Sequence, residues 1–288
     1  MSTTSNYYRL TIVGGTGVHS FVFTNSTIVV PPAASGLLDA SDTAIDTFNV
    51  SGSTIDGFTE GVLTGGSLQD WRGVTFVNNG PITVAGADIR NSAISGYEGT
   101  ADTSALIYNE TANPVGEFDG SSFTKGTAAT HAIEFGLSSP IAITLTDVTF
   151  SGYGADTTTS AALHIKRTTG TVTISWSGGT TPTYKSDGAT VVVQNTVTLT
   201  LKDVVSGSQC SIHAGATGPE TEGTELMNET AAGVDVTEPY AFTTDQSIIV
   251  RIRKSSAAPK YGPFDTPGTI TADGYTLTVN QIPDNISP

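Results

Sequence analysis

The chain has 288 residues, and Asp, Glu, Lys and Arg make up only 14% of them, against about a quarter in typical soluble domains. Its 12 Lys and Arg against 27 Asp and Glu give a net charge of −15, which argues against binding to nucleic acid or to anionic membranes, because both require clustered cations. Residues with high β propensity, such as Thr, Val and Ile, are abundant, and the charged residues that usually fill helix surfaces are scarce. This composition predicts an all-β protein.

Cysteine and histidine give no sign of a metal or cofactor site. The single cysteine, Cys210, cannot form an internal disulfide. The histidines are widely separated and show no metal-ligand spacing: His19, His131, His164 and His213. The start of the chain has no basic and apolar leader, and no window is apolar enough to span a membrane. We therefore expect no metal, no cofactor and synthesis as a soluble cytoplasmic product.

Residues 1–42 are expected to form an amino-terminal arm or cap. Two short β runs, Tyr8 to Val13 and Ser20 to Val30, precede the pair Pro31 and Pro32. Proline lacks the N–H that a sheet requires, so these residues should end the second run.

Residues 43–195 consist of very short β runs separated by Gly, Asn, Asp and Ser. A four-residue phrase recurs, with an aliphatic residue or Phe first, Gly or Asp third and an aromatic residue last: Ile55 to Phe58, Leu68 to Trp71, Ile94 to Tyr97 and Phe150 to Tyr153. The first three copies fit a step of 13 residues. Such a pattern predicts an irregular right-handed parallel β-helix, in which the Gly or Asp lies at a bend.

Residues 196–288 change character. Thr196 to Val204 alternates apolar and polar residues, Gln246 to Arg253 reads QSIIVRIR, and two more β runs surround the turn Ala272 to Gly274. This alternation, interrupted at short intervals, is typical of a small antiparallel β-sandwich of the immunoglobulin-like (Ig-like) type.

Polysaccharide-cleaving enzymes also use β-helices, so the carboxylates of the middle segment were compared: Asp56, Asp70, Asp88, Glu134 and Asp147. Asp70 is the most site-like, because Trp71 could stack on a sugar and Arg72 could hold an acid. A turn carboxylate beside a core tryptophan explains the same residues more simply. We expect no catalytic residue and no enzymatic activity.

The only basic cluster is formed by Arg251, Arg253, Lys254 and Lys260. Strand alternation places Arg251 and Arg253 on one face, where the cluster could contact an acidic surface of a neighbouring subunit or shell protein. A solvated edge that discourages strand pairing is the alternative.

Two stretches, Leu163 to Val205 and Ile249 to Ile286, resemble structural proteins of tailed-bacteriophage virions. In that family a β-helical segment precedes a sandwich with a similar VTLTL strand. The resemblance implies a homotrimer exposed on the virion, and its motifs mark no catalytic residue.

We therefore expect a capsid decoration or cement protein on the capsid surface, whose many weak contacts with the major capsid protein bridge neighbouring capsomers. The alternative is a receptor-binding protein of a tail fibre or tailspike that recognises host glycan, with Tyr240, Phe242 and Tyr261 as its aromatic surface. The third hypothesis is a polysaccharide-degrading spike.

Overall fold

The computed structural model describes residues 7–14, 20–31, 34–42, 44–45, 47–65, 69–108, 110, 112–136, 141–256 and 258–284. Every regular element within these ranges is a β-strand, so the all-β prediction is confirmed. In the same ranges there is no helix that could cross a membrane. The chain forms two compact units, Met1–Val193 and Gln194–Pro288, called unit 1 and unit 2 below.

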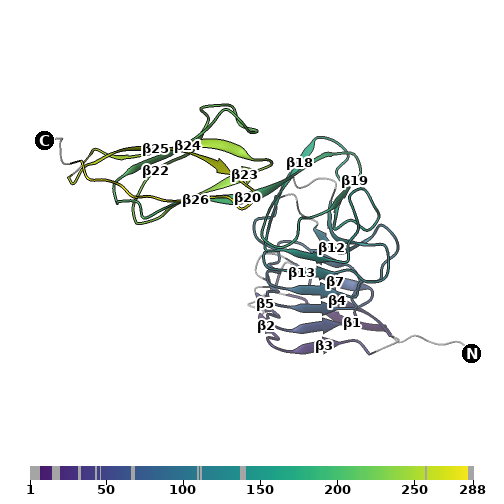
Figure 1. Ribbon diagram of the computed structural model, residues 1–288. Helices are drawn as coiled ribbons and strands as arrows, with labels where there is room; N and C mark the ends of the chain where they lie inside the picture. The colour runs from purple at the N-terminus through teal and green to yellow at the C-terminus, as the bar shows by residue number, and fades with distance from the viewer. Residues whose placement is uncertain are drawn as a thin grey trace, which may run out of the picture. The chain divides into compact units, whose positions relative to one another are not determined.

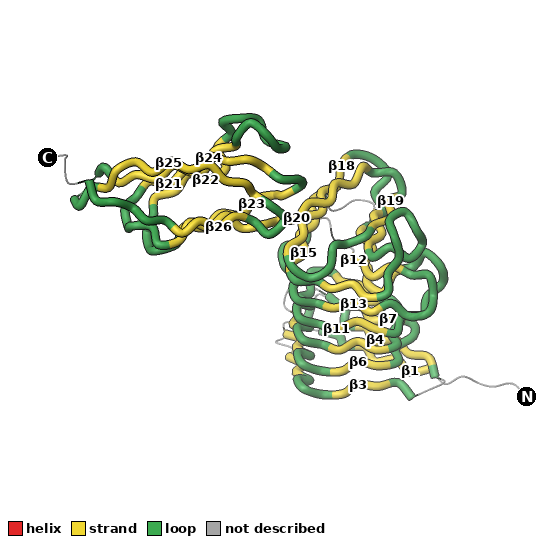
Figure 2. Tube along the Cα trace, in the orientation of Figure 1, coloured by secondary structure: helices red, strands yellow, loops and turns green. Residues whose placement is uncertain are grey.

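Unit 1 is built from parallel sheets whose strands are stacked one above another (Figures 1 and 2). The largest sheet contains, in order, β1 (Tyr7–Thr11), β4 (Ser35–Asp39), β7 (Gly61–Leu63), β10 (Ile82–Val84), β12 (Ser104–Tyr108), β14 (His131–Phe135), β17 (Leu163–Ile165) and β19 (Tyr184–Ser186). The second contains β3 (Thr27–Val29), β6 (Thr54–Asp56), β9 (Thr75–Val77), β11 (Ala93–Ser95), β13 (Ser122–Thr124) and β16 (Thr149–Ser151). The third contains β2 (Ser20–Val22), β5 (Thr47–Asn49) and β8 (Gln69–Asp70), while β15 (Ala142–Thr146) pairs with β18 (Thr171–Ser177).

From β1 to β9 the chain visits the three sheets in turn, and the third sheet ends at β8. One circuit of the stack is called a coil below. The coils differ in length: Thr75 pairs with Ala93, 18 residues later, whereas Ala93 pairs with Ser122, 29 residues later. The coils therefore have no constant length, in keeping with the irregular repeat of the sequence. Gly and Asn interrupt the chain every few residues, which keeps each strand short.

One corner of the stack repeats the same backbone conformation in successive coils. The residues that hold it have positive φ: Asn25, Gly52, Gly73, Asn91, Gly120, Asp147 and Gly178. The N–H of Gly52 donates to the carbonyl of Arg72 at 3.0 Å, and the N–H of Gly73 donates to the carbonyl of Arg90 at 2.9 Å. Gly, Asn and Asp occupy this corner because they adopt the left-handed conformation at the lowest cost.

Three of the four sequence phrases occupy equivalent places. Their strands β6, β11 and β16 lie in the same sheet, and each is followed by a glycine of positive φ: Gly57, Gly96 and Gly152. The phrase that ends at Trp71 belongs to β8 in a different sheet. These residues are therefore turn and packing elements, as their composition predicts.

Aromatic side chains pack against one another in the interior of unit 1. The rings of Phe48 and Trp71 are 5.1 Å apart, and those of Trp71 and Phe76 are 6.1 Å apart. The indole N–H of Trp71 donates to Oε1 of Gln69 at 2.9 Å, and the amide of Gln69 donates to the carbonyl of Ala40 at 2.6 Å. The buried polar atoms next to this stack are therefore paired, which avoids the cost of leaving them without a partner.

The described part of residues 1–42 contributes to the sheets of unit 1. β1, β2 and β3 are the end strands of the three sheets, and β4 already belongs to the next coil. Where it is described, the segment expected as an arm or cap thus forms the first coil of the stack and begins the second. Pro31 follows β3, as expected from its sequence, but the chain turns there and continues into β4.

Unit 2 contains two sheets. Strand β20 (Thr190–Lys202) crosses the division between the units; it pairs antiparallel with β23 (Val236–Phe242) and parallel with β26 (Tyr275–Thr278). The other sheet has the antiparallel order β22 (Glu225–Thr230), β21 (Gln209–Ala214), β24 (Gln246–Lys254) and β25 (Tyr261–Ile270). Apolar residues of both sheets, such as Leu199 and Val250, share one core.

The expectation of purely antiparallel pairing is wrong at β26. The turn around Asp273 joins β25 to β26, yet these strands lie in different sheets. The turn thus transfers the chain from one sheet to the other, where β26 aligns parallel to β20.

Candidate binding face of unit 2

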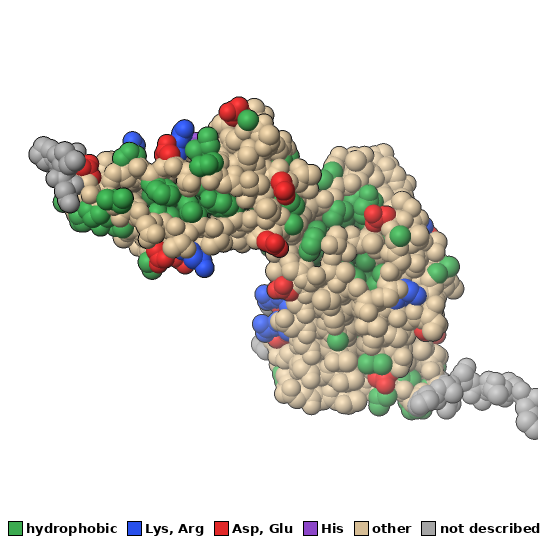
Figure 3. Space-filling model, in the orientation of Figure 1, with side chains coloured by type: hydrophobic (Ala, Val, Ile, Leu, Met, Phe, Trp, Pro, Cys, Tyr) green, Lys and Arg blue, Asp and Glu red, His purple; other side chains and the backbone are tan. Residues whose placement is uncertain are grey.

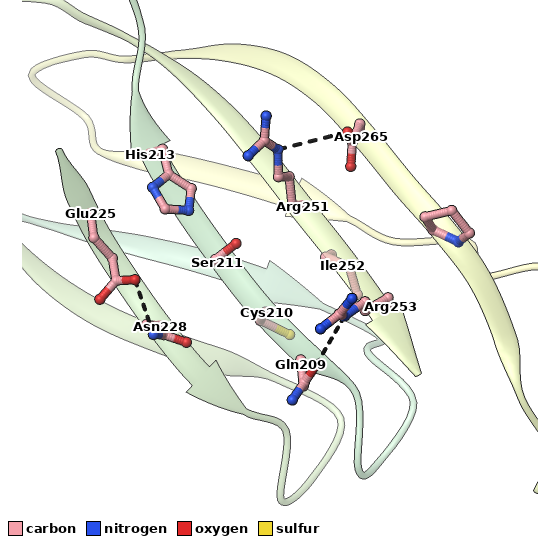
Figure 4. A pocket seen from close by; sticks show the side chains of 11 residues that line it. Gln209, Cys210, Ser211, His213, Glu225, Asn228, Arg251, Ile252, Arg253 and Asp265 are labelled. Carbon is pink, nitrogen blue, oxygen red and sulfur yellow. Dashed lines mark hydrogen bonds and ion pairs between the residues drawn. The ribbon is translucent and has the colours of Figure 1, made fainter. Parts of the chain in front are cut away.

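An open cavity of about 450 Å³ lies on the outer face of the sheet β22-β21-β24-β25 (Figure 4). Polar side chains from all four strands surround it, whereas Cys210 and Ile252 are buried beneath them. The remaining lining residues are Gln209, Ser211, His213, Glu225, Asn228, Arg251, Arg253, Pro263 and Asp265.

Strand alternation brings the polar residues to this face. In β24, Arg251 and Arg253 are exposed, while Val250 and Ile252 are buried. Pairing then sets their neighbours: Ser211 lies opposite Arg251, Gln209 opposite Arg253, and Asp265 opposite Arg251 on the other side. Arg251 and Arg253 thus share a face, as the sequence pattern predicts.

Hydrogen bonds and ion pairs hold the arginines in place. Nε of Arg253 donates to Oε1 of Gln209 at 3.0 Å, and Nε of Arg251 is 3.7 Å from Oδ2 of Asp265. More than half of the Arg251 side chain is exposed. A guanidinium has five N–H donors in a planar fork, so both arginines can still present donors to a carboxylate or phosphate.

The cavity has little potential for nucleophilic catalysis. Burial raises the pKa of the Cys210 thiol to about 11, so the unreactive protonated form dominates near neutral pH. His213 lies on the exposed face with Nδ1 3.4 Å from the carbonyl oxygen of Gly223. The arrangement is suited to binding a charged or hydroxyl-rich surface through hydrogen bonds.

Lys254 and Lys260, the other two residues of the basic cluster, do not line this cavity. Nζ of Lys254 is 5.9 Å from the ring centroid of Tyr261, a cation–π distance. Lys260 directly precedes β25. The four cations are close in sequence, but only the two arginines converge on the cavity.

Two of the carboxylates of unit 1 that were compared as catalytic candidates are engaged in ion pairs with arginines. Asp70 pairs with Arg72 at 2.7 Å, and Asp88 pairs with Arg90 at 2.6 Å. Trp71 is fully buried and cannot stack on a sugar. The three other candidates lie on separate elements: Asp56 in β6, Glu134 in β14 and Asp147 at the repeated corner.

The aromatic residues considered for glycan recognition do not form an exposed surface. Tyr240 is buried in the core of unit 2, and Phe242 packs against that core. Tyr261 is half-buried under Lys254. Glycan recognition by unit 2 would therefore rely on the polar residues of the cavity.

Sequence reasoning identified the two arginines but missed the residues around them. Gln209, Ser211 and His213 alternate along β21, and this signal was present in the sequence. Their position beside β24 was not, because pairing between strands so distant in sequence depends on the register of the folded sheet.

No family model matches the chain, and neither a curated protein nor a solved structure matches it.

Proposed function

We propose that this chain is a structural protein of a tailed-bacteriophage virion that decorates or cements the head shell and acts without catalysis. In this proposal unit 1 is an irregular right-handed parallel β-helix and unit 2 a small Ig-like sandwich. The resemblance of Leu163 to Val205 and Ile249 to Ile286 supports it, as does the succession of stacked parallel strands followed by a smaller β unit. The protein would be made in the bacterial cytoplasm and then occupy the capsid surface.

The exposed apolar first coil carries the proposal. Three of its side chains have large exposed fractions: 55% for Tyr7, 60% for Val22 and 55% for Val29. They belong to β1, β2 and β3, the end strands of the three sheets. Exposed strand edges with apolar side chains are templates for association, so this end would form the contact of a homotrimer.

The arginine-bearing face of unit 2 would provide the second contact, with an acidic surface of the major capsid protein. Each such contact is weak, because exposed ion pairs contribute little individually. Three copies held in one trimer convert them into a multivalent attachment that bridges capsomers. The face drawn in Figure 3 is dominated by uncharged atoms, which suits an assembly held by specific, sparse charges.

The copy number of the chain in purified particles tests where the protein is located. Quantitative mass spectrometry against the major capsid protein should give a number comparable with that of the shell protein. A few copies per particle would contradict the decoration role and favour the tail-fibre alternative, in which the polar cavity of unit 2 binds host glycan.

The role of the first coil is tested in solution. Val22→Asp combined with Val29→Asp should convert the trimer into monomers, because two buried carboxylates would be required at the contact. Val115→Asp is the matched control, since Val115 is 83% exposed and lies elsewhere in unit 1. Light scattering coupled to gel filtration measures the mass; a monomeric wild type, or a double variant that stays trimeric, would refute the trimer contact.

A further inference from the structure

Two histidines and an aspartate that are distant in sequence meet on the largest sheet of unit 1. Asp102 lies just before β12, His131 begins β14 and His164 is the central residue of β17. These are three consecutive strands of the parallel sheet. Coil stacking therefore brings together residues whose spacing gave no indication of a metal site.

The ligand-type atoms of this cluster are close together. Nε2 of His131 is 2.9 Å from Oδ1 of Asp102, and the two imidazole rings are 4.6 Å apart. One such atom from each of the three residues lies within 4.8 Å of the others. Both histidines are buried.

Each histidine has its other ring nitrogen fixed by an acceptor. Nδ1 of His131 is 2.7 Å from the carbonyl oxygen of Ala161, and Nε2 of His164 is 3.0 Å from Oδ1 of Asp187. A carbonyl and a carboxylate only accept, so these nitrogens donate. Histidines that bind metals are held in the same way, with one N–H given to a carbonyl or carboxylate and the opposite nitrogen facing the ion. At His131 the opposite nitrogen, Nε2, shares a proton with Oδ1 of Asp102, and a bound ion would displace that proton.

One ring nitrogen of His164 is not accounted for by the hydrogen bonds of the cluster. Its Nδ1 atom is buried and has no hydrogen-bond partner; the nearby Oε2 of Glu134 is 3.9 Å away. Because Nε2 of His164 donates to Asp187, Nδ1 is the ring nitrogen that offers a lone pair when the ring is neutral. A buried lone pair without a partner costs free energy.

We propose that Oδ1 of Asp102, Nε2 of His131 and Nδ1 of His164 bind one divalent transition-metal ion of the Zn²⁺ type. Two imidazoles and a carboxylate are ligands that such ions favour. The ion would join three neighbouring coils and stabilise unit 1. This role is structural and independent of the proposed attachment to a virion.

Lys185 would compete with the ion. Its ammonium group contacts both carboxylate oxygens of Asp102, and it must leave Oδ1 when a cation binds there. Removing this ammonium should therefore strengthen metal binding, although it removes an ion pair from the protein. A purely structural network of Asp102, His131 and Lys185 predicts no such gain.

The first test is titration of the tag-free full-length chain with ZnCl₂ in a calorimeter, with MgCl₂ as the comparison. We expect one Zn²⁺ per chain, a rise in the melting temperature with Zn²⁺ and no comparable effect of Mg²⁺, which prefers oxygen ligands. His164→Gln should abolish this uptake. His213→Gln, which removes a half-buried imidazole in unit 2, should leave it unchanged.

Two further variants keep the test decisive if His164→Gln folds poorly. Asp187→Asn leaves all three ligands in place but alters the partner of His164, and should weaken Zn²⁺ binding by about 10- to 100-fold. Lys185→Met should tighten it. Circular dichroism and tryptophan fluorescence verify folding. Absence of Zn²⁺ uptake by the wild type, or uptake insensitive to both His164→Gln and Asp187→Asn, would overturn the proposal.

Discussion

Asp70 shows how a single side chain contributes to stability in a pH-dependent way. Its carboxylate accepts hydrogen bonds from Nε of Arg72 at 2.8 Å and from Nη2 at 2.7 Å. These side-chain hydrogen bonds lower the pKa of Asp70 below the ordinary 3.8. Because the folded-state pKa lies below that of the unfolded chain, the ionised carboxylate stabilises the fold above about pH 4, and this stabilisation is lost as the pH falls through the lowered pKa.

Asp70→Asn should therefore reduce the urea midpoint of unit 1 at pH 7, and the difference from the wild type should shrink as the pH falls below the lowered pKa. Tryptophan fluorescence at a series of pH values measures it. Arg72→Met should remove the same pH dependence, and the double variant should add little, since the two residues form one interaction. A difference between Asp70→Asn and the wild type that is the same at every pH would contradict this account.

Residue-level expectations succeeded where they depended on neighbours in sequence. Trp71 lies in the core beside a carboxylate that binds Arg72, and Arg251 and Arg253 share a face, because these relations follow from strand alternation and short-range hydrogen bonds. His131 and His164 could not be paired in advance. Their contact depends on the length of the coil between them, which the irregular turns vary.

At the scale of elements, glycines at the repeated corner of unit 1 look alike in sequence but differ in the space around them. Gly73 and Gly120 both have positive φ, at 67° and 69°. A Cβ at Gly120 would lie 2.3 Å from Oδ1 of Asn91, whereas a Cβ at Gly73 would meet nothing closer than 3.7 Å. The corner at Gly73 thus has room for a side chain, whereas the corner at Gly120 is filled by the side chain of Asn91.

Gly73→Ala should lower the free energy of unfolding by about 1–2 kcal/mol, because alanine adopts the left-handed backbone conformation less readily than glycine. Gly120→Ala should cost more, because the clash with Asn91 adds to the same backbone term. Gly73→Asn should be milder than Gly73→Ala, since Asn already holds this conformation at other corners. Urea midpoints from tryptophan fluorescence rank the three; equal losses for the two alanine variants would show that Asn91 moves aside freely.

Strand existence in unit 1 was predictable from β propensity and from punctuation by Gly and Asn. Strand pairing was not. The 18-residue separation of Thr75 and Ala93 and the 29-residue separation of Ala93 and Ser122 show that loops of different length separate equivalent positions. Loops can vary in length at a low entropic cost. The period of the sequence therefore predicts little about which residues pair between strands.

At the scale of the whole molecule, the two units have separate apolar cores, and each contains a side chain whose signal reports on its unfolding. Both tryptophans, Trp71 and Trp176, belong to unit 1, where Trp71 is buried and Trp176 packs against the core. The only thiol, Cys210, is buried in unit 2. Tryptophan fluorescence therefore reports on unit 1, and reaction of Cys210 with a thiol reagent reports on unit 2.

Unit 2 should unfold at a lower urea concentration than unit 1, because a smaller chain buries a smaller fraction of its surface. Cys210 should resist a disulfide reagent at pH 8 in the native protein, since its pKa is raised to about 11 and its side chain is buried, and it should become reactive before the fluorescence changes. Cys210→Ser, which gives no thiol signal, controls for the reagent. Coincident transitions by the two probes would mean that the units unfold as one cooperative structure, and the division between Val193 and Gln194 would then have no counterpart in stability.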